Sequence, residues 1–254
     1  MPSNPHDSET FDGPPPGRID IHSHMLPGVD DGCTNLDEVL TSIEQLKQVG
    51  FVGSICTPHI WVDGPHRSCT PVAIADWTGK LRAQLRGRGI DYELWPGGEL
   101  RLFDGVIDWL KVNGIPSMAG SKYVLADFWE TRWPRWVNRV FEWLLAEGYH
   151  PILAHPERLS IPTNLRQRLR ELSSEGVLLQ GNFRCLTGAE GLLAQTQIQQ
   201  WLSEGCYSFL AVDMHRPDTL PSRLAGLSIL EQDRGPNFID DLTRTSPREL
   251  IFGL

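Results

Sequence analysis

Short apolar runs alternate with segments of helical periodicity along most of the chain. The runs are four or five residues long, which suits buried strands, and the longer segments between them place apolar residues on one helical face. Such alternation is typical of a parallel sheet covered by helices. We predict seven strands, at residues 19–23, 52–56, 92–95, 122–126, 151–154, 177–180 and 208–212.

The helix after the first predicted strand has the clearest boundaries. Asn35 is a suitable N-cap, Glu38 has the spacing of a capping box, and Gly50 ends the segment. Gly148 and Gly176 predict two further helix ends, each directly before a strand. Proline suits a first helical turn, so helices are expected to begin near Pro134 and at Ser246–Pro247.

The chain of 254 residues favours a single domain. Residues 1–17 are polar and contain three consecutive prolines, so we expect them to form a disordered leader. Residues 18–254 would then fold as one α/β domain, a barrel of alternating strands and helices.

A formal net charge of −9 argues against a nucleic-acid partner. An anionic substrate would therefore need a local source of positive charge.

The sequence has no apolar run long enough to cross a membrane and no N-terminal signal peptide, so a cytoplasmic protein without membrane insertion is expected. The five cysteines are scattered and never in a C-x-x-C pair, which favours reduced thiols. The oligomeric state stays open.

Metal-binding residue types recur where the predicted strands end. His22 and His24 end the first strand, two residues apart, and point to the same side. Taken alone, this pair fits two half-buried structural histidines as well as a metal site. However, the ends of parallel barrel strands converge on one rim, and similar residues follow the other strands. The full candidate set is His22, His24, Asp31, His59, Glu99, Asp127, His155, Asp213 and His215.

Five imidazoles and four carboxylates are too many donors for one or two ions, so we expect three divalent metal ions. Their charge would outweigh that of the carboxylates by about two units, enough to hold a phosphate dianion. Nitrogen and oxygen donors without thiolate suit Mn, Fe or Zn. Ions bridged by Glu99 would supply a hydroxide at neutral pH for attack on phosphorus.

Five motifs in order give a family resemblance: DIHSHMLPGVDDG (20–32), CTPH (56–59), GGEL (97–100), AHPER (154–158) and AVDMH (211–215). From residue 19 to the C-terminus the chain resembles the PHP superfamily, named for polymerase and histidinol phosphatase. Within it, the chain is most similar to the bacterial manganese-dependent protein-tyrosine phosphatases of capsule and exopolysaccharide operons. This resemblance implies a distorted (β/α)7 TIM-like barrel, a trinuclear site and Mn as the metal.

The resemblance also implies roles for individual residues. His22, His24, Glu99 and Asp213 would serve one ion, and the remaining candidates would join the others. Arg158 would hold phosphate oxygens and stabilise the transition state. We expect Arg158, Asp31 and His59 to act in catalysis.

Two positions depart from the family pattern. Asp127 stands where the family usually has Glu, so its ion must shift or bind more weakly. The family's second phosphate-binding arginine has no direct counterpart after His215, and either Arg216 or Arg223 would replace it.

Asp127 is followed by three tryptophans, Trp129, Trp133 and Trp136. They could form an aromatic wall for a phosphotyrosine ring or take part in ordinary packing. For Trp136 we favour packing.

The predicted function is a metal-dependent protein-tyrosine phosphatase regulating exopolysaccharide synthesis, with a phosphotyrosine protein as partner, in particular a bacterial tyrosine kinase of that system. Two alternatives remain: a phosphatase of small esters such as histidinol phosphate, and a barrel that binds without turnover.

Overall fold

Two parallel sheets make up the centre of the protein in a computed structural model that describes residues 16–62, 64, 69–161 and 164–253. One sheet has the order β1-β2-β4 and the other β3-β5-β6-β7-β8-β9. The strands are β1 (Arg18–Ser23), β2 (Phe51–Cys56), β3 (His59–Ile60), β4 (Glu93–Pro96), β5 (Glu99–Arg101), β6 (Tyr123–Asp127), β7 (His150–Ala154), β8 (Leu178–Asn182) and β9 (Phe209–Ala211).

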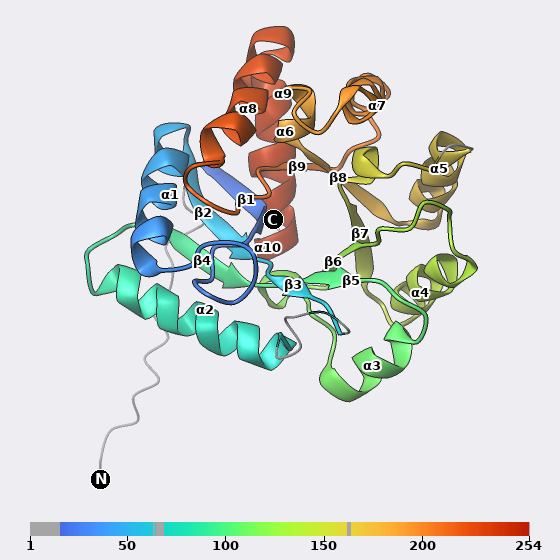
Figure 1. The fold of residues 1–254 in the computed structure, drawn as a ribbon, viewed down its shortest axis with the longest axis horizontal. Coiled ribbons are helices and arrows are strands. Elements are labelled where there is room, and N and C mark those ends of the chain that lie inside the picture. The colour runs from blue at the N-terminus through green and yellow to red at the C-terminus, as the bar shows by residue number, and fades with distance from the viewer. Residues whose placement is uncertain (1–15, 63, 65–68, 162–163, 254) are drawn as a thin grey trace.

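Helices surround the strands, as Figure 1 shows. They are α1 (Leu36–Gln48), α2 (Pro71–Arg86), α3 (Val106–Asn113), α4 (Arg135–Ala146), α5 (Leu165–Glu175), α6 (Phe183–Leu186), α7 (Leu192–Ser203), α8 (Leu220–Arg234), α9 (Pro236–Asp240) and α10 (Ser246–Phe252). Short helical turns occur at η1 (Met118–Gly120), η2 (Pro156–Arg158) and η3 (Asp241–Thr245).

The two sheets approach each other along β1 and β9. Ser23 and Met214 form a parallel bridge, and the Asp20 carboxylate accepts a hydrogen bond of 2.9 Å from the Val212 amide. At the other edge, the strand ladders are interrupted between β4 and β3. The fold is therefore mixed α/β with parallel sheets, in which the described strands form two sheets rather than one continuous ladder.

Both sheets contribute to one inner apolar cluster. Its members come from β1, β2, β6, β7 and β9, with Met118 and Leu250 added from η1 and α10: Ile21, Ile55, Leu125, Ile152, Ala154, Phe209 and Ala211. A larger cluster packs the sheets against the surrounding helices. Because strand side chains alternate between two faces, one set fills the interior and the other packs beneath the helices.

All seven predicted strands are present, with ends within two residues of those expected. The predicted cap of α1 is also present, since Asn35 Oδ1 accepts from the Glu38 amide at 3.0 Å. In return, Glu38 Oε2 accepts from the amide of Thr34 rather than from that of Asn35. The sequence analysis missed β3 and β5 because strands of two and three residues are too short to show alternation.

Residues 1–15 of the predicted disordered leader lie outside the described residues. Within the described part of the chain, we find no helix that combines the length and the apolar character needed to cross a lipid bilayer.

Candidate metal centre

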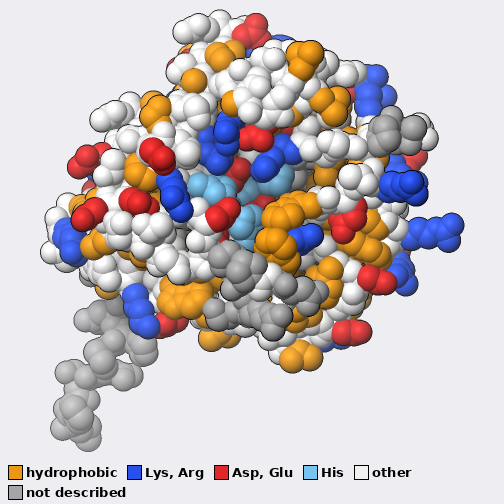
Figure 2. Space-filling model, viewed as in Figure 1, with side chains coloured by type: hydrophobic (Ala, Val, Ile, Leu, Met, Phe, Trp, Pro, Cys, Tyr) orange, Lys and Arg blue, Asp and Glu red, His pale blue; other side chains and the backbone are white. Residues whose placement is uncertain are grey.

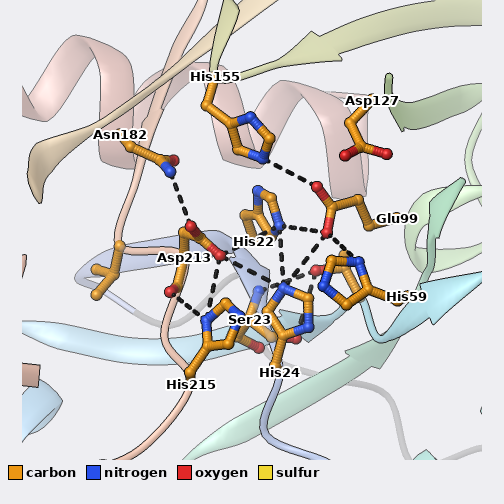
Figure 3. Close-up of polar contacts among 12 residues, drawn as sticks. His22, Ser23, His24, His59, Glu99, Asp127, His155, Asn182, Asp213 and His215 are labelled. Carbon is orange, nitrogen blue, oxygen red and sulfur yellow. Dashed lines mark hydrogen bonds and ion pairs between the residues drawn. The ribbon is translucent and has the colours of Figure 1, made fainter. Parts of the chain in front are cut away.

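The predicted donor residues come together at the ends of the strands, as Figure 3 shows for most of them. His22 lies on β1 and His24 directly follows it. Glu99 begins β5, and His59 begins the neighbouring β3 at the same level of the sheet. Asp127 ends β6, while the other donors follow β1, β7 and β9: Asp31, His155, Asp213 and His215.

Three overlapping groups of donor atoms are close enough to hold ions. Within each group the ligand atoms lie within 4.8 Å of one another. The groups are His22, Glu99 and His155; His22, His24 and Asp213; and His24, Asp31, His59 and His215. The structure thus brings together eight of the nine predicted donors in groups that share His22 and His24.

Glu99 connects these groups through both carboxylate oxygens. Its Oε1 lies 2.9 Å from His155 Nε2, and its Oε2 lies 2.9 Å from His59 Nδ1 and 3.2 Å from His22 Nε2. Burial alone would raise the pKa of Glu99, but the charges of His22 and His59 hold it well below its usual value. The carboxylate is therefore ionised and central to the cluster.

Two of the five candidate histidines are held in the neutral form that binds a metal. Burial lowers the pKa of His155, assisted by the charge of Arg158. Burial and the neighbouring His24 lower the pKa of His215 to about 4. Both imidazoles are thus neutral at pH 7, with a lone pair available for a cation.

Asp127 stands slightly apart and belongs to none of the three groups among the described residues. Its Oδ2 accepts a hydrogen bond from the Trp129 indole, while its buried Oδ1 has no hydrogen-bond partner. Burial and the charge of Glu99 raise the pKa of Asp127 to about 7. A buried carboxylate oxygen without a partner is costly, and a bound cation would satisfy it.

The sequence analysis missed three residues that orient the donors. Asp30 Oδ2 lies 2.7 Å from His24 Nδ1, and Gln180 Oε1 lies 2.9 Å from His22 Nδ1. Asn182 Nδ2 donates to Asp213 Oδ2 at 2.8 Å. A metal-binding histidine usually forms such a hydrogen bond through the ring nitrogen that does not bind the metal, as His24 and His22 do with Asp30 and Gln180. The only sequence signals were the pairing of two aspartates at 30–31 and the polar alternation at 180 and 182.

Two candidate donors have a left-handed backbone. His155 has a φ of 33° and Asp213 a φ of 53°, which are unfavourable for residues with a side chain. The side chains of both residues nevertheless point into the cluster (Figure 3). Strain of this kind is concentrated at functional sites, where the surrounding structure maintains it.

All the candidate donors except His22 and His24 line a cavity of about 190 Å³, which we call the cup. Figure 2 shows the histidines in a hollow bordered by charged and hydrophobic side chains. Arg158 and Arg223 line the cup and lie 3.7 and 3.1 Å from Asp213 Oδ2. Arg158 is partly exposed, Arg223 is buried, and Arg216 is exposed outside the lining residues. Arg184 also reaches the cup, paired with Glu190 at 3.0 Å.

The donor set fits a divalent cation of intermediate hardness. Imidazole nitrogens and carboxylate oxygens converge, and none of the five cysteines lines the cup. The Nε2 atoms of His22 and His24 lie only 3.2 Å apart. The buried Oδ1 atom of Asp127, which lines the cup, has no hydrogen-bond partner. Bound cations would satisfy both features, which accords with Mn, Fe or Zn.

The three tryptophans after β6 occupy different places. Trp129 borders the cup and is 48% exposed. Trp133 packs edge-on against Phe128 and donates to Asn138 at 2.7 Å. Trp136 is partly buried on α4, as its packing interpretation predicts.

Comparison with known proteins places these residues in a family. The sequence profile of the CpsB/CapC family, described as capsular polysaccharide synthesis, matches residues 18–252. The chain is 28% identical to the tyrosine-protein phosphatase YwqE of Bacillus subtilis (strain 168), over 79% of this chain and 78% of the relative.

Two solved structures are similar in fold. One, from work on YwqE of Bacillus subtilis and CpsB of Streptococcus pneumoniae, described as metal-dependent tyrosine phosphatases, is 26% identical. It has a TM-score of 0.77 and covers 92% of this chain and 94% of its own. The phosphotriesterase homology protein of Escherichia coli is 11% identical with a TM-score of 0.58, covering 92% of this chain and 98% of its own, and shares the fold alone.

Proposed function

Since the chain belongs to the CpsB/CapC family of capsular polysaccharide synthesis, we propose that it is a metal-dependent protein-tyrosine phosphatase. Its relative YwqE is named a tyrosine-protein phosphatase, and the solved structure from the work on YwqE and CpsB is described as a metal-dependent tyrosine phosphatase. The observation that carries the proposal is the convergence of eight donors, Glu99 among them, beside arginines that face the same cup.

The proposed site holds three divalent ions, with Mn as the native metal. The ligands are the nine predicted residues: His22, His24, Asp31, His59, Glu99, Asp127, His155, Asp213 and His215. Three donor groups with shared members, together with the unpartnered oxygen of Asp127, support this number. We further propose that the two sheets form a distorted (β/α)7 barrel, which the shared inner apolar cluster supports.

Bound ions would supply Lewis acidity and lower the pKa of a water molecule that attacks phosphorus. The chain's own residues orient the substrate. Arg158 is placed to hold the non-bridging phosphate oxygens, because its side chain is 42% exposed and lines the cup. Arg223 is better placed than Arg216 for a second phosphate contact, since it lines the cup and Arg216 does not.

Asp31 and His59 are proposed to act next to the reacting group. Asp31 Oδ1 lies 3.5 Å from His59 Nε2 and 3.6 Å from His215 Nε2, and the side chain of Asp31 is 59% exposed. An exposed carboxylate beside two imidazoles can both bind an ion and accept or return a proton during turnover. The proposed protein substrate is a bacterial tyrosine kinase of an exopolysaccharide system.

The test combines elemental analysis with activity measurements. We expect the purified protein to contain Mn, Fe or Zn and to hydrolyse p-nitrophenyl phosphate and a phosphotyrosyl peptide. Glu99→Gln should reduce both metal content and turnover, whereas Arg139→Ala, an exposed arginine on α4, is the matched surface control.

Preference for histidinol phosphate over the peptide would identify a small-molecule phosphatase instead. Full metal content without phosphate release from any of these substrates would indicate a binding protein and refute the proposed activity.

A further inference from the structure

A second cavity lies directly beside the cup. It has a volume of about 400 Å³ and runs between residues 128–131, after β6, and residues 155–160, around η2. We call it the flanking groove. It shares Trp129, His155 and Arg158 with the cup, so the two cavities are adjacent.

The chemistry of the two cavities differs. Apart from Trp129, the cup is lined by ionisable side chains, and its volume of about 190 Å³ must accommodate both ions and phosphate. The flanking groove is also lined by Phe128 and Leu159, which are 2% and 8% exposed, and by Glu130, Thr131 and Ser160. The groove is therefore less charged than the cup. An aromatic ring attached to a phosphate in the cup would be buried more favourably in the groove than in the cup.

Trp129 separates the two cavities and is fixed on several sides. Its indole N–H donates to Asp127, and its ring meets that of Trp61 edge-on at 4.9 Å between centroids. The Arg101 guanidinium lies 4.2 Å from the Trp129 ring and 4.3 Å from the Trp61 ring. Cation–π contacts of this length stabilise the ring arrangement.

Despite these contacts, Trp129 remains 48% exposed. Because its neighbours hold the ring in place, its exposed part offers a preformed aromatic surface to a ligand in the groove. Its position at the mouth of the cup is where the ring of an aryl phosphate would emerge, and stacking on a preformed aromatic wall adds to binding. Figure 2 shows a hydrophobic patch at this border of the hollow.

We propose that the flanking groove binds the aromatic ring and adjoining main chain of a phosphotyrosyl substrate, with Trp129 as the stacking wall. Trp61 and Arg101 act as positioning residues for Trp129. The inference rests on the proposed phosphatase function and adds the origin of its selectivity: the cup recognises phosphate, and the groove selects aryl over alkyl esters.

The test measures the ratio of kcat/KM for phenyl phosphate to kcat/KM for ethyl phosphate. This ratio is insensitive to metal occupancy, which changes both rates together. Three variants address the groove: Ser160→Trp fills it, Trp129→Leu removes the aromatic wall, and Trp129→Phe keeps an aromatic ring. Ser174→Trp, at an exposed position on α5, is the matched control.

We expect Ser160→Trp and Trp129→Leu to lower the aryl-to-alkyl ratio by about 10-fold, and Trp129→Phe to retain most of it. Ser160→Trp should also raise KM for a phosphotyrosyl peptide. The inhibition constant of inorganic phosphate, which occupies only the cup, should stay within about twofold for Ser160→Trp. The control should leave every value unchanged.

Equal losses on phenyl and ethyl phosphate in Ser160→Trp and Trp129→Leu would overturn the groove assignment while leaving the phosphatase intact. A wild-type protein that is fully loaded with metal yet neither turns over these esters nor binds inorganic phosphate would instead overturn the proposed function, and the groove assignment with it.

Discussion

The Nδ1 atom of His24 lies 2.7 Å from the Oδ2 atom of Asp30, and both side chains are buried. The same carboxylate accepts the His59 amide at 3.0 Å and, through Oδ1, the Gly32 amide at 3.0 Å. Asp30 thereby fixes the direction of one candidate ligand and the main chain of another. With Nδ1 occupied, the Nε2 atom of His24 faces Asp213 and Glu99.

Asp30→Asn is expected to weaken metal binding without removing a ligand. The amide keeps the shape of the side chain but loses the negative charge that orients and strengthens the His24 imidazole. Outer partners of this kind are worth about 10–100-fold in metal affinity. Titration calorimetry with Mn on the metal-free protein measures the change.

Asp108→Asn is the control for this substitution, because that side chain is 89% exposed on α3. Equal Mn affinity in Asp30→Asn and the wild type would show that the contact does not support metal binding.

Arg158→Ala is expected to lower kcat for p-nitrophenyl phosphate by about 10²–10³-fold, as loss of a preorganised donor to developing charge does elsewhere. Arg158→Lys should recover only part of this, since an ammonium cannot form the two parallel bonds of a guanidinium. Steady-state kinetics at full metal occupancy measures both. A loss confined to KM would place Arg158 in substrate binding rather than in transition-state stabilisation.

Metal removal is expected to destabilise the protein more at pH 8 than at pH 6. Burial by itself lowers the pKa of His22 and His59, but the carboxylates around them raise it above the usual value in the metal-free chain. A raised histidine pKa stabilises the fold below about pH 6.5, the unfolded value, and this stabilisation is lost as pH rises through the folded pKa. Above it, the buried Glu99 and Asp213 carboxylates lose their imidazolium partners unless cations replace them.

Thermal unfolding with EDTA and with excess Mn at both pH values tests this expectation. The difference in Tm between the two conditions should grow with pH, because binding also requires neutral imidazoles. A difference that shrinks toward pH 8 would contradict the linkage.

Two glycine substitutions in helices should have opposite effects on stability. A Cβ at Gly226 of α8 would lie 1.8 Å from the Phe183 carbonyl oxygen, where α6 begins, so Gly226→Ala must push the two helices apart. We expect a loss of about 3 kcal/mol in the free energy of unfolding. Gly79→Ala, at an exposed position of α2 with open space around it, should gain about 0.5–1 kcal/mol. Urea denaturation measures both, and equal stabilities would disprove the close packing of α6 on α8.

The sequence predicted those elements whose signal lies in residues close together along the chain. Strand β1 alternates Ile19 and Ile21 with polar residues, and β7 contains a short apolar run. The cap at Asn35 depends on residues three positions apart. The short strands β3 and β5 had no such signal, because their pairing with each other is the only feature that makes them strands. For the same reason the sequence could not identify Asp30, whose role depends on its contact with His24.

By itself, the sequence determined the residue types available for the site and their order at the ends of apolar runs, because side-chain chemistry and hydrophobic periodicity are written along the chain. Only the tertiary structure decided which candidate donors lie together, that Arg223 rather than Arg216 lines the cup, and that Trp129 rather than Trp133 borders it. These outcomes depend on distances between segments far apart in the chain, and such distances are set by how the sheets and helices pack.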